Sequence, residues 1–299
     1  MAESPLITYL RLQRALDRDV LAMLRTTYAS VSAELHRLQT RSGIGARVRE
    51  DQLRMTFVAI NRDLSAYWAA VGDIVQSRQY AAAAASAEAM WNSPNLRLVM
   101  PQQDIDYLLR SAKESAQQSL KVALERVSGS SYVSLAESVY NNQALTSGKI
   151  DDIVNAALGR GASAAELARD VRAYINPNVR GGVRYASMRL GRTELNNAFH
   201  AGQVRSAQEC PWTTGVLWNL SGSHPKPDEC NTYADEVHFE GGDPGVFRPS
   251  EVPEKPHPNC LCFCTPETVS RQVFISQFTS GAYDSVIDQM IRDGGMTIR

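Results

Sequence analysis

Near the N-terminus, hydrophobic residues recur every three or four positions. The stripe consists of Leu6, Leu10, Leu16, Val20, Leu24, Tyr28, Val31, Leu35 and Leu38. This spacing predicts one long amphipathic helix from residue 6 to about residue 38. At 1.5 Å per residue the helix is on the order of 50 Å long. One small core cannot cover that length, so we expect the stripe to pack against other long helices or against another chain.

The helical pattern continues to about residue 208. A run of alanines at 81–85 has the best helix-forming composition available. Ser163 is followed three residues later by Glu166, which is a capping-box signature. Further helices are expected over about 47–91, from Pro101 to the SGSS run at 128–131, in shorter pieces to about 158, within 159–177, and over about 183–208.

The pattern changes after residue 208. Residues 212–230 are rich in β-formers and turn residues, and 241–258 are dense in Gly and Pro. We expect a strand at VFIS, 273–276, and a short helix at 285–295. The predicted fold class is therefore mainly α, with a long-helix N-terminal region and a small α+β C-terminal module. The predicted boundaries are 1–130 for the long helices, 131–208 for shorter helices and 209–299 for the module.

Composition narrows the classes of protein that fit. The 299 residues carry a formal net charge of −1, with a pI of about 6.5, so no overall positive field points to nucleic acid. No window approaches the roughly 18–20 apolar residues of a membrane span, and the charged N-terminus is unlike a secretory signal. The five cysteines fit a reducing compartment better than a disulfide scaffold.

Three of the five cysteines lie in PHPNCLCFCTP, residues 256–266. Prolines on both sides of His257 favour an extended backbone, in which Cys260, Cys262 and Cys264 share one face. Upstream, HPKPDEC supplies a second cluster with His224, Asp228 and Cys230. Two ligand clusters separated by a loop are typical of a zinc site in a small domain.

Geometry limits how many of these thiols can bind one ion. Strand positions two apart are about 6.6 Å apart, whereas sulfurs around one zinc ion lie roughly 4 Å from each other, so a third alternating cysteine fits only with a sharp turn. The preferred ligand set is Cys230, His257, Cys260 and Cys262, with His224 as the main substitute and Cys264 as a buried small side chain.

Other interpretations of these residues stay open. Free cysteines often simply pack in a core, and a redox relay would need the CxxC motif that is absent. His238 and Glu240 have the HxE form of a zinc deaminase, but the Pro-Cys-x-x-Cys half is missing. A metal-dependent nuclease could use His224, Asp228 and His257, and would need a basic groove.

Arg189, Arg192 and Asn196 share one face of the helix expected before the module. A solvated or ion-paired helix face is the usual reason for such a pattern. The functional alternative is a polar latch that connects this helix to the Cys/His module.

The order of these features resembles the Mu F-like family of phage minor head proteins. The matching residues are Arg192, Thr193, Glu194, Asn197, Trp218, His224, Asp228, Cys230, and His257 to Cys262 of HPNCLC, with the GxSxxELA segment at 161–168 before them. The HPNCxC motif is the most specific part. Leu261 stands where the family commonly has a basic residue, Cys264 is an extra cysteine, and the upstream half offers only one cysteine.

The resemblance implies a structural virion protein rather than an enzyme. Such a protein is present in few copies inside the phage head, is made in the host cytoplasm, and acts in head morphogenesis or genome delivery. Its expected partners are the portal protein, sister copies, other head proteins and packaged DNA. We place the portal or self contact on the N-terminal stripe, at Leu16, Val20 and Leu24, because of its helical length. The alternative function is a metal-dependent enzyme that acts on nucleic acid.

Overall fold

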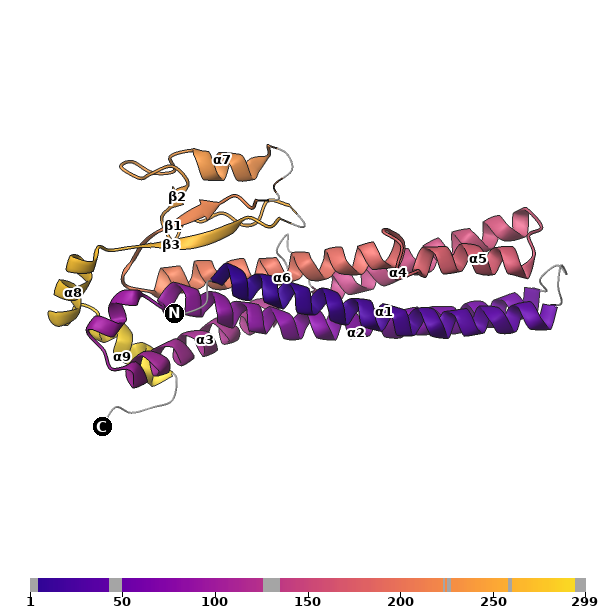
Figure 1. The fold of residues 1–299 in the computed structure, drawn as a ribbon, viewed down its shortest axis with the longest axis horizontal. Helices are drawn as coiled ribbons and strands as arrows, with labels where there is room; N and C mark the ends of the chain where they lie inside the picture. The colour runs from indigo at the N-terminus through magenta and orange to yellow at the C-terminus, as the bar shows by residue number, and fades with distance from the viewer. Residues whose placement is uncertain are drawn as a thin grey trace. The chain divides into compact units, whose positions relative to one another are not determined.

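The computed structural model describes residues 5–42, 50–125, 135–222, 224, 227–257 and 260–293. Its first part consists of helices (Figure 1), which are α1 (Pro5–Ser42), α2 (Glu50–Trp91), the 3₁₀ helix η1 (Pro94–Leu98), α3 (Gln102–Glu125), α4 (Leu135–Gly159), α5 (Ala164–Ile175) and α6 (Gly182–Glu209). These bounds confirm the long helices expected from the hydrophobic spacing. The expected starts and ends near residues 47 and 128 lie outside the described residues.

The C-terminal part combines a small sheet with short helices. Its elements are β1 (Thr213–Asn219), α7 (Glu229–Asp235), β2 (Val246–Phe247), β3 (Phe263–Thr268), α8 (Arg271–Thr279) and α9 (Asp284–Asp293). The sheet has the order β2-β1-β3 and is antiparallel, with Val216 opposite Phe247 and Trp218 opposite Cys264. The predicted fold class, mainly α with a small α+β C-terminal part, is confirmed.

Two local predictions were wrong. VFIS, at 273–276, lies in α8 and not in a strand: the Ser270 side chain accepts a hydrogen bond from the Val273 backbone N–H and caps the helix, which buries Phe274 in the core. Tertiary packing thus overrides the β preference of Val, Phe and Ile. The residues from 135 to 159 form one helix, α4, rather than shorter pieces. The capping box of Ser163 and Glu166 is present at the start of α5, as predicted.

The chain divides into two compact units that do not follow the predicted boundaries at 130 and 208. Unit 1 contains residues 1–13, 78–128 and 193–299, and unit 2 contains residues 14–77 and 129–192. A change in composition at residue 209 marks a change of secondary structure. It does not mark the edge of a compact unit, because the sheet shares a core with helical segments from earlier in the chain.

Unit 2 is a helical body built from parts of α1, α2 and α6 together with α4 and α5. Helix α4 is joined to α2 by polar pairs: the Trp68 Nε1–H donates to Thr146 Oγ1 at 3.1 Å, and the Ser147 hydroxyl donates to Asn61 Oδ1 at 2.7 Å. Arg192 on α6 pairs with Asp17 on α1, with Nε to Oδ1 at 3.0 Å. These pairs fix the register of helices whose apolar faces form the core.

From Leu16 to Leu38, the N-terminal stripe lies in unit 2 and is largely buried there, which corrects its assignment as a docking face. Leu16 and Val20 are each 1% exposed and Leu24 is 0% exposed. Leu16 packs beside Gly191 of α6, where the missing side chain lets the two helices approach closely. This part of the stripe is covered within unit 2 itself. Leu16, Val20 and Leu24 are therefore not available for a portal or self contact.

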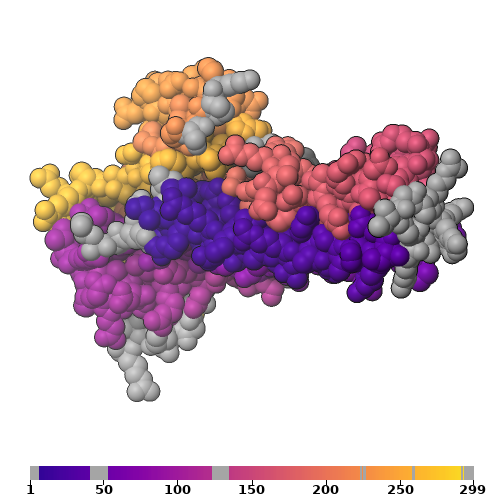
Figure 2. Space-filling model, turned by 45° about the vertical axis from the view of Figure 1, so that its right-hand side comes forward, coloured from indigo at the N-terminus to yellow at the C-terminus, as the bar shows by residue number. Residues whose placement is uncertain are grey.

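Unit 1 has one hydrophobic core in which early and late segments meet. Trp91 of α2 and Trp212 before β1 make an edge-to-face contact with ring centroids 5.3 Å apart, and Trp212 also contacts Phe274 and Tyr283. Helix α9 packs against α3. Figure 1 shows α9, in yellow, beside α3, and in Figure 2 the yellow C-terminal segment borders the magenta segment that contains α3. The sheet and its loops therefore rest on helices of the same unit.

Within the described residues, no helix is both long enough and apolar enough to cross a membrane.

Candidate metal centre

Helix α7 directs Cys230 into the core. Asp228 caps the helix: its Oδ1 accepts a hydrogen bond from the Cys230 backbone N–H at 2.8 Å, and Asn231 Oδ1 accepts one in return from the Asp228 N–H at 3.1 Å. This reciprocal box satisfies backbone donors at the start of a short helix. The cap holds the first turn in place, and the Cys230 side chain is 0% exposed.

Cys260 and Cys262 lie in the segment that leads into β3. Both side chains are buried, and neither belongs to the strand itself, which begins at Phe263. The Cys260 N–H donates to the His257 carbonyl, so the backbone bends before the strand starts. This bend lets two alternating cysteines approach one point, which a straight strand does not allow. Pro258 and Asn259 of the motif lie outside the described residues.

Side chains of α6 hold the backbone of this segment. The Asn196 amide donates to the Cys260 carbonyl, and Gln203 Nε2 donates to the Cys264 carbonyl at 2.7 Å. His200 Nε2 lies 2.8 Å from the Pro253 carbonyl oxygen, and all three side chains are buried. They recur at four- and three-residue spacing on one helix face. This polar latch includes Asn196 of the predicted face, whereas Arg192 pairs with Asp17 instead.

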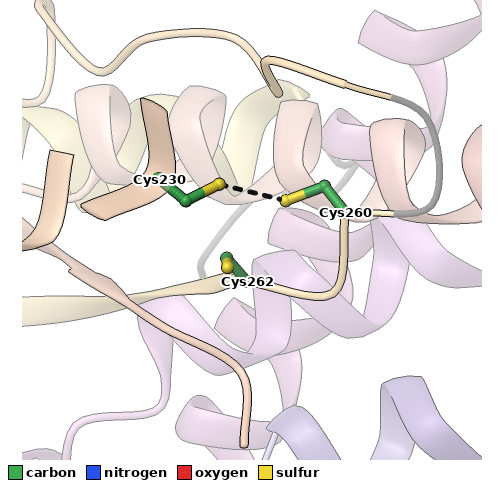
Figure 3. Close-up of side chains that lie close together, drawn as sticks. All are labelled: Cys230, Cys260 and Cys262. Carbon is green, nitrogen blue, oxygen red and sulfur yellow. Dashed lines mark hydrogen bonds between the residues drawn. The ribbon is translucent and has the colours of Figure 1, made fainter. Parts of the chain in front are cut away.

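The sulfurs of Cys230, Cys260 and Cys262 lie within 4.8 Å of one another. Figure 3 shows the three side chains gathered in one place, Cys230 from α7 and the other two from the segment before β3. The Cys230 and Cys260 sulfurs are 3.5 Å apart, and all three are free thiols. That separation is far from the roughly 2.05 Å of a disulfide. It is close to the edge of a zinc–thiolate tetrahedron, about 3.8 Å for bonds of about 2.3 Å.

Two imidazoles and a carboxylate border the sulfurs. His257 Nε2 lies 3.7 Å from the Cys230 sulfur, and His224 Nδ1 lies 3.8 Å from the Cys262 sulfur. Asp228 lies near both rings, with Oδ2 2.9 Å from His257 Nε2 and Oδ1 3.4 Å from His224 Nε2. The fold thus brings together every residue of the ligand set predicted from the sequence, including the substitute His224.

The thiols have unequal proton affinities. Burial raises the pKa of Cys230 to about 12. A hydrogen bond between Cys260 and Cys262 lowers the pKa of the Cys260 thiol and raises that of Cys262, so that one proton is held between the two sulfurs. A bound cation reverses this preference for the protonated form, because a metal ligates the thiolate. Metal binding to this cluster must therefore release protons.

Cys264 lies outside the sulfur cluster. Its sulfur is 3.6 Å from His200 Nδ1, and His200 Nε2 faces the Pro253 carbonyl, which can only accept a hydrogen bond. Nε2 therefore carries the proton, and Nδ1 accepts the Cys264 S–H. Burial raises the pKa of Cys264 to about 11 and lowers that of His200 to about 3, so this pair is a neutral thiol and a neutral imidazole.

The HxE segment is used differently from a deaminase motif. The His238 ring stacks on Phe247 with centroids 3.7 Å apart, and its Nε2 lies 2.8 Å from the Tyr233 carbonyl. Glu240 is exposed. Neither residue belongs to the groups of potential metal ligands found among the described residues.

The chain was compared with protein-family models, with curated proteins and with solved structures, and no match was found.

The cluster can hold a metal ion. Three thiols that can ionise, with an imidazole at either side, form a donor set that suits a thiophilic ion such as Zn²⁺ and not a hard cation such as Mg²⁺. The sequence did not single out Asn231, His200 or Gln203 for this site. Polar residues at 196, 200 and 203, on an otherwise apolar helix face, were the signal available for the latch; nothing local marked Asn231.

Proposed function

We propose that this chain is a structural minor head protein of a phage, associated with the portal inside the head and acting in head morphogenesis or genome delivery. The observation that carries the proposal is the convergence of the two halves of the Cys/His motif. The residues of HPKPDEC and HPNCLC are separate in the sequence, yet their ligand atoms gather around the sulfurs of Cys230, Cys260 and Cys262. These two clusters are part of the order of features by which the chain resembles the Mu F-like family, and a single site accounts for that part.

We further propose that the cluster binds one Zn²⁺ ion that stabilises unit 1. Three buried thiolates and one imidazole complete a four-coordinate shell and leave no open position for a substrate, which is the arrangement of structural rather than catalytic zinc. The segments that carry the ligands contain few regular elements: α7 has seven residues and β2 has two. Binding of the ion therefore supplies folding free energy where backbone structure supplies little.

In this proposal, residues other than Leu16, Val20 and Leu24 make the portal contact. Leu16, Val20 and Leu24 belong to the core of unit 2. A charged substitution at these positions changes folding before it changes binding. A test of portal association therefore uses the intact chain.

The head assignment is tested in heads purified from the phage that encodes the chain. Quantitative mass spectrometry should find the chain at a copy number comparable to that of the portal protein and far below that of the major shell protein. Co-expression with the portal protein of the same phage should give a complex that elutes as one species. A chain that is absent from heads and elutes apart from the portal contradicts the assignment.

The zinc assignment is tested on protein purified without chelator. Elemental analysis should give about one zinc ion per chain, and a Cys260→Ser, Cys262→Ser double variant should contain none. Cys210→Ser is the matched control, because Cys210 is equally buried but lies outside the cluster. Wild-type protein without bound metal that also fails to take up added zinc contradicts the assignment.

A second candidate function is a metal-dependent nuclease, which is favoured by one observation. Asp228 lies between His224 and His257, 3.4 and 2.9 Å from their Nε2 atoms, so the three groups named for that chemistry are adjacent. Incubation of the protein with plasmid DNA and Zn²⁺ or Mg²⁺ separates the two functions. DNA cleavage that is lost in Asp228→Asn would favour the nuclease over the structural role.

A further inference from the structure

The cluster offers two histidines for one remaining coordination position. His224 approaches the sulfur of Cys262 and His257 approaches that of Cys230, at 3.8 and 3.7 Å. Both distances are near the sulfur–nitrogen edge of a zinc tetrahedron, about 3.6 Å for bonds of about 2.3 and 2.05 Å. Distance alone does not choose between them. The proton on each ring does, because a metal binds only a ring nitrogen with a free lone pair.

The hydrogen bonds of His224 fix its tautomer. Its Nε2 lies 2.9 Å from Asn231 Oδ1. The same Asn231 atom accepts the backbone N–H of Asp228 at 3.1 Å, and since a backbone N–H can only donate, that atom is the amide oxygen. The oxygen can only accept, so His224 Nε2 carries a hydrogen. Nδ1 is then the nitrogen with the lone pair, and it is the one that faces Cys262.

In His257, by contrast, the ring nitrogen that faces the sulfur cluster is the one that carries the hydrogen. The nitrogen that faces the Cys230 sulfur is Nε2, and the same nitrogen lies 2.9 Å from Asp228 Oδ2. A carboxylate oxygen only accepts, so His257 Nε2 carries its hydrogen there. For this ring to bind a metal among the sulfurs, it must first lose its contact with Asp228 and then turn or change tautomer.

We infer that His224, through Nδ1, is the fourth ligand beside Cys230, Cys260 and Cys262, and that His257 stays outside the coordination shell in its pair with Asp228. The inference rests on the proposed zinc site. It makes Asn231 the residue that orients the ligand. In metal sites, a ligating histidine almost always donates its second N–H to a carboxylate, carbonyl or water, which fixes the tautomer and the ring orientation.

This assignment changes what the ion connects. With His224, one ligand comes from the connection between β1 and α7, one from the first turn of α7, and two from the segment before β3. With His257, Cys230 of α7 is the only ligand that precedes the segment before β3. The two-plus-two arrangement ties both loops to one point, so that the ion closes a long loop between residues 224 and 262. Removal of the ion should release both segments together.

The test measures zinc affinity by competition with a chromophoric chelator, using the full chain. His224→Ala should weaken zinc binding by at least about 100-fold, because it removes a direct ligand. His257→Ala should weaken it by less than about tenfold, and Asn231→Ala by about 10–100-fold, as is typical of residues that orient a ligand. His36→Ala is the control for loss of an imidazole, since His36 is exposed on α1.

Cobalt substitution and a rescue variant cover the case in which His224→Ala does not fold. In His224→Cys a thiolate replaces the imidazole, so the protein should keep its metal. The intensity of its sulfur-to-cobalt absorption should then rise by about one third, from three thiolates to four. His257→Cys should leave that absorption unchanged. Circular dichroism checks that each variant is helical.

Each remaining outcome contradicts a different statement. If His257→Ala loses the metal and His224→Ala keeps it, or if both variants weaken binding equally, the inference about His224 is wrong while the zinc site stands. If neither variant weakens binding, the fourth ligand is not a histidine. If the wild-type protein binds no zinc or cobalt, the proposed metal site itself fails.

Discussion

Replacing Leu24 by Ala tests whether the N-terminal stripe is a core or a docking face. Leu24 is 0% exposed in α1, in the part of the helix that belongs to unit 2. Truncation removes three buried carbon atoms and leaves a cavity. Substitutions of this kind cost roughly 2–5 kcal/mol, and the cost rises with the volume of the cavity that remains. We expect the upper part of that range, because the surrounding helices are held by polar pairs and cannot readily collapse into the space.

Leu145→Ala is the matched control. It makes the same chemical change in a helix of the same unit, but Leu145 is 71% exposed. Surface substitutions of this kind usually change stability by less than about 0.5 kcal/mol. Both variants are unfolded in urea and followed by circular dichroism at 222 nm. Hydrogen exchange of peptides from residues 14–77 locates the loss of stability.

The expected result is a large loss for Leu24→Ala, with faster exchange in unit 2, and almost none for Leu145→Ala. A docking face would give a different result: Leu24→Ala would be as stable as Leu145→Ala and would lose only partner binding. Equal urea midpoints for the two variants would therefore refute the burial argument. By the same reasoning, a triple change of Leu16, Val20 and Leu24 to Asp should prevent folding of unit 2, because charges in a core are costly to desolvate.

Three further predictions concern two helical glycines, the buried carboxyl of Glu194 and the cysteine cluster. Gly202→Ala should destabilise the protein because the new Cβ would overlap the buried Ser86 hydroxyl on α2. Gly148→Ala adds a Cβ where there is open space on a helix, so it should raise the free energy of unfolding by about 0.5–1 kcal/mol. Urea unfolding of both variants measures the difference. Burial raises the pKa of Glu194 from about 4.5 to about 7. The protonated carboxyl therefore contributes its full stability below about pH 4.5, and this contribution is lost as the pH rises through 7. Glu194→Gln should remove this pH dependence, and urea midpoints that change equally between pH 5 and pH 8 in both proteins would contradict it. The Cys260→Ser, Cys262→Ser double variant should become sensitive to protease within unit 1, including residues 78–128, and loss confined to residues after 209 would show that the sheet folds separately from those helices.

The helices, the change in composition near residue 209 and the candidate metal ligands could all be predicted from the amino-acid sequence. Spacing of three and four along α1 predicts a helix because the helical period places those side chains on one face. The capping box at Ser163 was equally readable, since its hydrogen bonds join residues three apart. Likewise, the chemistry of Cys230, Cys260 and Cys262 follows from residue type. These features depend on local geometry, which is determined by residues that are close together in the sequence.

What covers the N-terminal stripe, and which groups meet at the candidate metal centre, became clear from the three-dimensional structure alone. An apolar face is compatible with an internal or an external partner. Leu24 is buried within unit 2, which combines distant parts of the chain, so its partner is internal. The tautomer of His224 depends on Asn231, whose amide oxygen is oriented by the cap of α7. The domain boundary failed at residue 209 for a related reason: Trp212 packs on Trp91, and a contact between residues so far apart leaves no trace in composition.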